Sequence, residues 1–318
     1  MAHGSPPGNL RRPLYYLKAN APELERYDCG PPGPRRNVST PQPPPAPAAE
    51  SCLVRHDFLL RRLHSLSGLI PIGAYLVVHL LTNASVLESP ARFQENVYTI
   101  HSLGKLLPVV EWVFIFIPIL FHAIFGFVII GSGKSNTSHY PRGSNVRYTL
   151  QRVTGMIAFA FIAWHVFHMR GWIHNSWWLT HVTEPLGGAQ FKPYNAASTA
   201  GRSMQGLLVN VFYFTGITAS VFHLANGIWS MGITWGVWTK PNAQKRALRV
   251  CAVFGVLLLA VGLAAQYGMW SVGREPNVKQ AETVEDKIHK SLLEAGRIEE
   301  TPEKRSKPRQ TGTASAER

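Results

Sequence analysis

The sequence predicts an all-α membrane protein with five transmembrane helices, and two observations support this. Only 16% of the 318 residues are charged, against about 25% in soluble domains. The deficit is confined to five apolar stretches that together contain two charged side chains, Glu111 and Arg170. Each stretch has the length of about 20 residues that a helix needs to cross the hydrocarbon core of a bilayer. A soluble globular domain is therefore excluded.

The five stretches are apolar throughout, without the alternation that strands of a membrane barrel would show, so we expect helices. Pro71 and Pro118 fall inside two of them and are expected to produce kinks that neighbouring helices accommodate. The predicted helices cover residues 66–86, 107–130, 153–173, 207–229 and 250–270.

Polar segments flank this five-helix domain, which we place at residues 53–272. Residues 1–52 contain 12 of the 23 prolines, which predicts an extended or disordered arm without a cleavable signal sequence. Residues 273–318 are predicted to form a polar tail. The tail contains one short amphipathic pattern, at Val284, Ile288, Leu292 and Ala295.

Basic residues are unevenly distributed between the connecting loops. Three segments hold 11 Lys or Arg in 41 residues, namely 55–62, 131–152 and 239–249, whereas the other connections hold 8 in 76. The positive-inside rule therefore predicts that these three segments and the N-terminus lie in the cytoplasm, with the C-terminus outside. The net charge of +14 is spread over these flanks and the tails, so no concentrated patch indicates binding to nucleic acid.

Four histidines lie well inside the first four predicted helices: His79, His122, His165 and His223. An ionisable side chain at that depth is costly and marks a candidate functional site, although a single one could be a structural residue bonded to a neighbouring helix. The helical rise and the predicted orientation place His79 and His165 at one level towards the outer face. His122 and His223 then share a level towards the inner face.

Two level pairs of histidines on facing helices are what two bis-histidine haems require, with one pair for each iron. No CxxCH motif accompanies them, so covalent c-type haem is disfavoured. We expect no spare histidine at the depth of the inner pair. His168, three residues after His165, is a second choice for the outer ligand.

The helices that carry these histidines resemble one another in sequence. Residues 63–79 are similar to 150–165, and FHAIFG at 121–126 is similar to FHLANG at 222–227. In the second pair of segments Gly126 and Gly227 follow the histidine by four residues. They would lie on its face of the helix and allow a flat macrocycle to approach the backbone, although glycine also serves helix packing in membranes.

Other polar residues are weaker candidates. Arg62, Ser65 and Arg152 lie at the predicted cytoplasmic interface, where they could bind haem propionates or a quinone head group, although flanking arginines also serve topology. Near the outer end of the second helix, Glu95 and Glu111 are candidates for the proton exchange that quinone chemistry needs, with Lys105 and His101 behind them.

Four runs together are similar to one family of membrane proteins: RRLHSLSGLIPIGAYLVVHLLTN, FIFIPILFHAIFG, QRVTGMIAFAFIAWHVF and FHLANGIWSMGITWG. They resemble the cytochrome b membrane subunits of succinate dehydrogenase and fumarate reductase, of the single-chain, five-helix, two-haem type. The resemblance covers roughly residues 55–272 and implies a bundle of the first four helices that binds two haem b groups. His79 and His165 would ligate the outer haem, and His122 and His223 the inner haem.

The resemblance also implies partners that the residues alone do not indicate. These are a flavoprotein subunit and an iron-sulfur subunit on the cytoplasmic face, and a quinone, commonly menaquinone, in the membrane.

One departure from the family pattern concerns the movement of protons. Some di-haem fumarate reductases carry a glutamate two residues before the inner ligand, whereas this chain has Val221, so a transmembrane proton path through that position is not expected.

The resulting hypothesis is a membrane anchor and electron conduit of a succinate:quinone oxidoreductase in the cytoplasmic membrane of a bacterium. The chain by itself is not expected to turn over succinate. Two alternatives remain from the sequence. One is a di-haem quinone-reactive subunit of another dehydrogenase, and the other is a transporter that uses buried histidines as relays.

Overall fold

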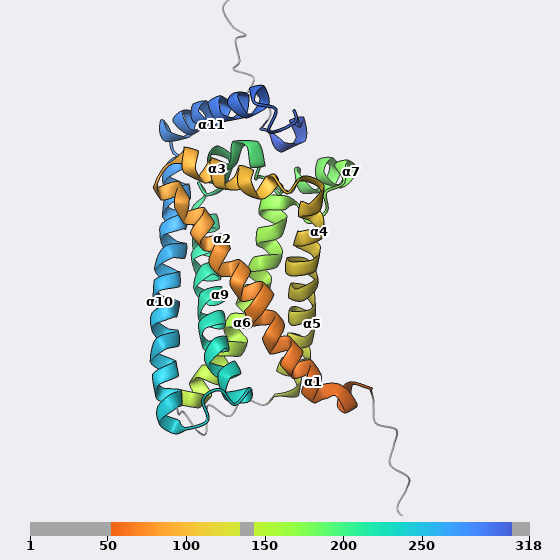
Figure 1. Cartoon of the computed structure of the whole chain (residues 1–318), viewed down its shortest axis with the longest axis vertical. Helices are drawn as coiled ribbons and strands as arrows, with labels where there is room; N and C mark the ends of the chain where they lie inside the picture. The colour runs from red at the N-terminus through yellow and green to blue at the C-terminus, as the bar shows by residue number, and fades with distance from the viewer. Residues whose placement is uncertain (1–51, 134–142, 307–318) are drawn as a thin grey trace, which may run out of the picture. The chain divides into compact units, whose positions relative to one another are not determined.

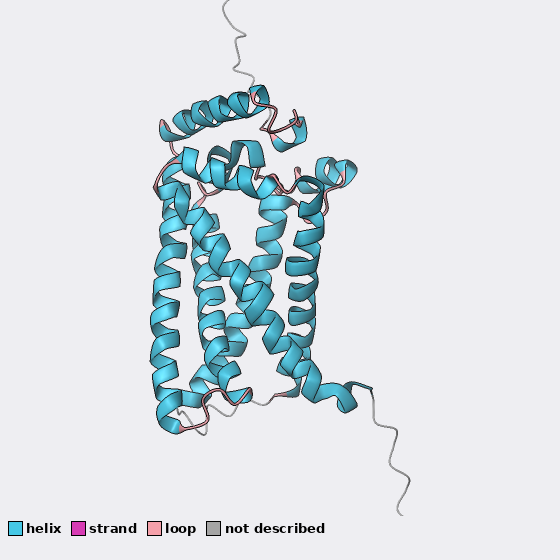
Figure 2. Ribbon diagram, viewed as in Figure 1, coloured by secondary structure: helices cyan, strands magenta, loops and turns pink. Residues whose placement is uncertain are grey.

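The computed structural model describes residues 52–133 and 143–306, and within them the chain forms helices and no strand (Figures 1 and 2). The α-helices are α1 Cys52–Ser67, α2 Ala74–Ala84, α3 Pro90–His101, α4 Leu107–Glu111, α5 Ile117–Ser132, α6 Gly143–Arg170, α7 Ser176–Trp178, α8 Ala196–Ser203, α9 Leu207–Thr234, α10 Pro241–Val272 and α11 Asn277–Glu294. Short π-helical segments are η1 Gly68–Gly73, η4 Trp112–Phe116 and η5 Leu179–Thr183. Single 3-10 turns are η2 Ser85–Leu87, η3 Gly104–Leu106, η6 Pro193–Asn195 and η7 Pro302–Lys304. The predicted disordered arm, apart from Cys52, lies outside the described residues.

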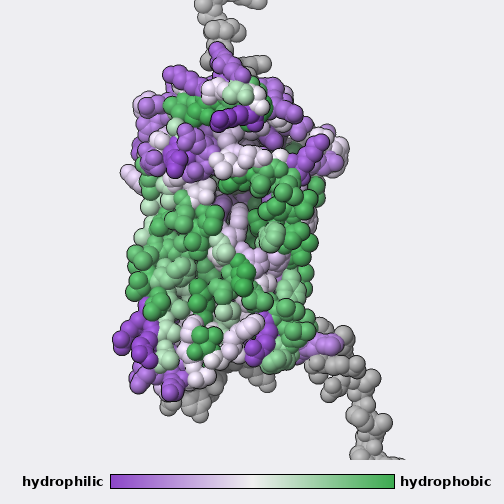
Figure 3. Space-filling view, viewed as in Figure 1, coloured by the Kyte–Doolittle hydropathy of each residue, from purple (hydrophilic) through white to green (hydrophobic). Residues whose placement is uncertain are grey.

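The five predicted transmembrane helices are confirmed, as five helical stretches long and apolar enough to cross a membrane. They are His56–Leu87, Gly104–Ser132, Asn145–Arg170, Leu207–Thr234 and Pro241–Val272. Their side chains form an apolar band between two hydrophilic ends (Figure 3). The third helix ends at Arg170, three residues before the predicted end, because Gly171 has a φ of 84°. Its amide hydrogen-bonds to the carbonyls of Val166 and Phe167, as in a glycine-terminated helix.

The first span crosses the bundle obliquely (Figure 1). Its first part, α1, packs against α5, and its second part, α2, packs against α10, while α9 contacts both α6 and α10. Pro71 lies in η1, and Pro118 lies in the first turn of α5 directly after η4. Both prolines therefore coincide with π-helical segments, where helices commonly bend.

The two ends of the bundle differ in what covers them. We call the end at which α1, α6 and α10 begin the basic end. We call the opposite end the capped end, because α3, α8 and α11 lie across it (Figure 1). The predicted histidine pairs are located by the same two names, according to the end of the bundle that each pair is nearer.

A buried carboxylate attaches α11 to α8 at the capped end. Glu285 is fully buried and accepts hydrogen bonds from the backbone amides of Ala197 (2.7 Å) and Ser198 (3.0 Å) and from the Ser198 hydroxyl (2.6 Å). These amides belong to the first turn of α8, where a helix has unpaired N–H groups. Burial raises the pKa of the Glu285 carboxyl, and the bonds from Ser198, Ala197 and Asn195 act in the opposite direction.

The buried face of α11 differs from the amphipathic pattern expected in the polar tail. Its buried positions are Val278, Ala281, Glu285 and His289, whereas Val284, Ile288 and Leu292 are only half-buried. The prediction followed apolar side chains alone. The buried face instead combines the apolar residues Val278 and Ala281 with polar contacts, among them a hydrogen bond between Nδ1 of His289 and the Tyr98 hydroxyl (3.0 Å).

Candidate functional site

The structure brings His79 and His165 together near the capped end. His79 projects from α2 and His165 from α6, and their ring centres are 5.9 Å apart with the planes inclined at 78°. The two residues are 86 positions apart in the sequence, so the pair exists only because α2 crosses in front of α6.

A second pair lies towards the basic end. His122 from α5 and His223 from α9 have ring centres 6.1 Å apart, with planes inclined at 88°. Both pairs therefore combine imidazoles from two different spans at nearly the same separation. The depth argument from the sequence proposed these two combinations.

In the pair at the basic end, Nδ1 of each histidine contacts a backbone carbonyl of a neighbouring helix. Nδ1 of His122 lies 2.9 Å from the carbonyl oxygen of His64, and Nδ1 of His223 lies 2.9 Å from that of Gln151. Because a carbonyl only accepts, both imidazoles must carry their proton on Nδ1. Nε2 of each then carries the lone pair, as in a metal ligand whose other nitrogen is bonded. In this structure the side-chain amide nitrogen of Gln151 lies 3.5 Å from Nε2 of His223.

At the capped end, tyrosine hydroxyls take the place of these carbonyls. Nδ1 of His165 lies 3.0 Å from the Tyr213 hydroxyl, and Nδ1 of His79 lies 3.4 Å from the Tyr75 hydroxyl. A hydroxyl can donate or accept, so these contacts are compatible with a proton on Nδ1 and a free lone pair on Nε2.

The separations of the rings fit a shared metal ion between each pair. A metal–imidazole bond is about 2.0 Å, and the ring centre lies about 1.2 Å beyond the nitrogen, so two coaxial imidazoles have centres about 6.4 Å apart. Among the described residues no three His, Cys, Asp or Glu side chains form a metal-binding group. Two ligands suffice for a macrocycle that supplies its own four nitrogen donors, and the donor set of each pair therefore fits haem.

Two glycines that the sequence analysis missed make room for the pair at the basic end. A Cβ atom on Gly68 would lie 2.4 Å from the His122 ring, and one on Gly155 would lie 2.8 Å from the His223 ring. Both follow by four residues the carbonyl that the histidine contacts. The repeat itself, with LHSLSG in one segment and LQRVTG in the other, was the signal that could have identified them.

The predicted glycines Gly126 and Gly227 lie against other helices. The nearest side-chain atoms to a Cβ on these residues would belong to His64 and Gln151, each at 3.4 Å. His64 also stacks on His122, with ring centres 3.9 Å apart. The expectation that no spare histidine lies at the depth of this pair is therefore wrong, because the first span begins at His56, before the predicted start at residue 66, and includes His64.

The predicted polar residues at the basic end make protein contacts. Arg62 donates to the Thr234 carbonyl (3.2 Å), and its guanidinium lies over the Trp235 ring. Ser65 accepts a hydrogen bond from the Trp235 indole (3.0 Å), and the guanidinium of Arg152 lies 4.1 Å from the Tyr148 ring centre. The contacts of Arg62 and Ser65 join the start of the first span to the end of α9, whereas that of Arg152 lies within α6.

At the capped end the two candidate carboxylates are in different environments. Glu95 is exposed on α3 and pairs with Arg92 (3.5 Å), whereas Glu111 is half-buried and pairs with Arg170 of α6 (2.6 Å). Nearby, burial lowers the pKa of His101 to about 4, with smaller contributions from Lys304 and other basic groups. His101 is therefore neutral at pH 7 and a poor proton donor there.

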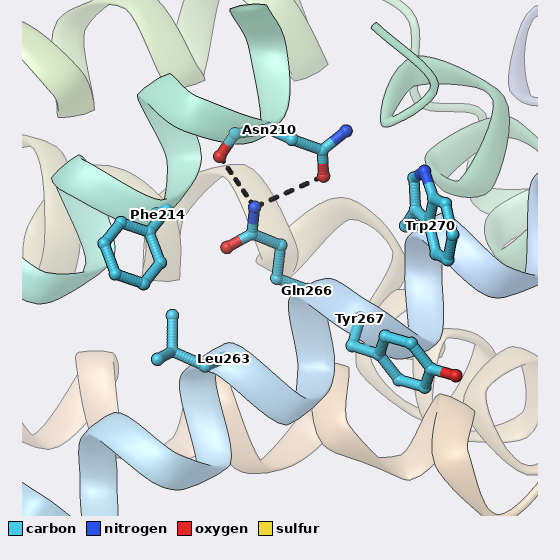
Figure 4. A pocket seen from close by; sticks show the side chains of 6 residues that line it. All are labelled: Asn210, Phe214, Leu263, Gln266, Tyr267 and Trp270. Atoms are coloured by element: carbon cyan, nitrogen blue, oxygen red, sulfur yellow. Dashed lines mark hydrogen bonds between the residues drawn. The ribbon is translucent and has the colours of Figure 1, made fainter. Parts of the chain in front are cut away.

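A shallow groove of about 310 Å³ lies between α9 and α10 (Figure 4). Its polar centre is Gln266, which donates to the backbone oxygen of Asn210 (2.8 Å) and to its side-chain oxygen (3.3 Å). Phe214, Leu263, Tyr267 and Trp270 complete the lining. None of the four paired histidines lines this groove, so it is separate from the site.

Five apolar spans define a multi-pass membrane protein, in which four histidines form two pairs between the helices. No family model matches the sequence. The chain is 32% identical over 209 residues to the succinate dehydrogenase cytochrome b558 subunit of Bacillus subtilis (strain 168). The aligned region covers 66% of this chain and 95% of that protein. The chain therefore belongs to the family of succinate dehydrogenase cytochrome b subunits, multi-pass proteins of the bacterial inner membrane. The family resemblance seen in the sequence is confirmed.

We expect Gly68→Val to displace His122 and to lower the haem content of the purified chain, because the added side chain would occupy the space of the imidazole. Gly131→Ala in α5 is the matched control, since a Cβ there meets nothing within 4 Å. Haem per chain, measured from the absorbance of the pyridine complex, should fall for Gly68→Val alone. Equal haem content in both variants would show that the glycine contact is not needed.

Proposed function

We propose that this chain, a membrane anchor of a succinate:quinone oxidoreductase, is also its electron conduit and holds two b-type haems. The anchoring role rests on the family and on the five spans. The conduit role is supported above all by one observation. Four histidines from four different spans form two pairs at different levels of the bundle, with ring separations of 5.9 and 6.1 Å.

Each pair would hold one haem through Nε2 atoms. Bound haems would supply one-electron transfer between an iron-sulfur subunit and a membrane quinone. The chain's own residues orient the ligands. The carbonyls of His64 and Gln151 accept hydrogen bonds from Nδ1 of two imidazoles, and Gly68 and Gly155 leave space beside them.

Partner subunits are proposed to bind at the basic end. The flavoprotein and iron-sulfur subunits would lie on the cytoplasmic face, which the positive-inside rule assigns to this end. Lys245, Arg246 and Arg249 are three basic residues on α10 there, around a shallow surface depression. The pair formed by His122 and His223 is nearer this end and would be first to exchange electrons with the iron-sulfur subunit.

The quinone, which we propose to be menaquinone, is assigned to the capped end. Quinone reduction needs protons as well as electrons, so its site must adjoin both water and the pair formed by His79 and His165. Arg170 lies five residues after His165, about 7.5 Å along the helix, and is held by Glu111. Glu95 is exposed to water in the cap and remains the proposed proton-exchanging side chain.

His223→Ala tests the haem assignment. It should lower the haem content from about two to about one per chain and abolish quinone-linked succinate oxidation, because one axial ligand is lost. His181→Ala, on the exposed segment η5, is the control and should retain both haems. His122→Ala should be combined with His64→Ala, since His64 stacks on His122 and could replace it. Full haem occupancy in His223→Ala would contradict the pairing.

Membrane orientation can be tested with single cysteines in a chain whose Cys29, Cys52 and Cys251 are replaced by Ser. Both Glu184→Cys, near the capped end, and Asn242→Cys, near the basic end, are at exposed positions. An impermeant maleimide added to intact cells should label Glu184→Cys, and should label Asn242→Cys only after permeabilisation. The reverse pattern would place the partner subunits on the other face.

The quinone assignment predicts that Glu95→Gln lowers succinate oxidation with quinone by about 100-fold, the usual range for loss of a general acid or base. Oxidation with a soluble dye that accepts electrons from the catalytic subunits should be unchanged. Glu184→Gln, another exposed carboxylate at the capped end, is the matched control. If Glu95→Gln equals the control in both assays, proton exchange occurs elsewhere.

A further inference from the structure

The buried side chains of Tyr213 and His168 form a hydrogen-bonded chain with His165, a member of the pair at the capped end. The Tyr213 hydroxyl of α9 lies 3.0 Å from Nδ1 of His165 and 3.2 Å from Nδ1 of His168, both on α6. Tyr213 and His168 are 6% and 7% exposed. The sequence analysis considered His168 only as a rival ligand, whereas the structure directs its Nδ1 at Tyr213.

Only one assignment of protons satisfies this chain if His165 is a ligand. Nε2 must then keep its lone pair, so the proton is on Nδ1 and is donated to the Tyr213 oxygen. The Tyr213 O–H is then free to donate in the other direction, and Nδ1 of His168 is its acceptor. His168 consequently carries its own proton on Nε2.

Packing holds the acceptor in place. The indole of Trp164 stacks on the His168 ring, with centres 4.4 Å apart and planes 15° apart. Phe161 stacks on His165 at 5.6 Å and contacts the edge of Tyr213 at 5.3 Å. The three members of the hydrogen-bonded chain therefore have little freedom to exchange partners.

The contacts of the other three paired histidines are different. His122 and His223 donate to backbone carbonyls, and His79 has a longer contact of 3.4 Å to Tyr75, one turn away on its own helix. For His165 the acceptor strength of the partner depends on a further side chain, because a hydroxyl that donates to His168 becomes a better acceptor itself. His165 is thus a paired histidine whose partner is a tyrosine hydroxyl that a second imidazole contacts in turn.

We propose that Tyr213 and His168 are positioning residues for the haem at the capped end. His168 orients the Tyr213 hydroxyl, and Tyr213 fixes the proton of His165 on Nδ1 and strengthens its donation to iron. Stronger donation favours ferric iron and lowers the reduction potential of that haem. The inference rests on the proposed function, in which His165 is an axial ligand.

The test uses the purified complex and measures the midpoint potential of each haem by redox titration with optical detection. Tyr213→Phe and His168→Phe should both raise the potential of one haem and leave the other unchanged. The expected change in the reduction equilibrium is about tenfold, which is about 59 mV for a one-electron couple. In His168→Asn the midpoint potential of that haem should equal the value in the unaltered complex, because the asparagine amide oxygen can accept a hydrogen bond from Tyr213. Tyr267→Phe, an exposed tyrosine on α10, is the control.

The outcomes separate this inference from the proposed function. If the unaltered complex lacks haem, the proposed function fails. If both haems bind and Tyr213→Phe and His168→Phe leave both potentials unchanged, the positioning role is overturned. Should Tyr213→Phe lose its haem, the two His168 variants decide, since His168→Phe keeps an aromatic ring on Trp164. A shift in His168→Phe that His168→Asn does not reverse would refute the acceptor role.

Discussion

A buried imidazole has two nitrogens to satisfy, and hydrocarbon provides a partner for neither. The arrangement of the helices around the two pairs follows from that constraint. At the basic end Nδ1 of His122 and His223 is bonded to a carbonyl of a neighbouring span. A helical carbonyl already accepts one amide, and its second lone pair is reachable only if nothing covers it. Gly68 and Gly155, one turn further on, leave room for the two imidazole rings to reach these carbonyls.

The same solution occurs twice because the chain contains two related halves. His64 and Gln151 occupy equivalent positions in the repeat, as do Gly68 and Gly155, and Gly126 and Gly227 lie against the first two at the same distance. The halves diverge towards the capped end, where His79 is near a tyrosine of its own helix and His165 contacts one from α9. The two pairs thus share a geometry of rings and differ in the groups behind them.

Directional polar contacts attach α11 to the rest of the capped end, in addition to its buried Val278 and Ala281. Glu285 is bonded to the first turn of α8, and ion pairs join Arg202 to Glu282 and Arg305 to Asp286. Such contacts define the position of α11 over α8 closely, because each buried donor left without its acceptor would cost about 1–3 kcal/mol. The capped end is therefore an ordered protein surface next to the pair formed by His79 and His165.

The sequence by itself determined the five spans and the four deep histidines, because apolar length and the cost of burying an ionisable group are local properties that composition reveals. It also indicated which histidines share a level, since depth follows from helical rise. Only the tertiary structure decided what surrounds them. The stacking of His64 on His122, the place of Gly68 and Gly155, and the bonds of Tyr213 to two histidines depend on how far each helix is rotated and where α2 crosses the bundle. The buried face of α11 was missed for a related reason, since Glu285 and His289 belong to it through hydrogen bonds that no pattern of apolar residues encodes.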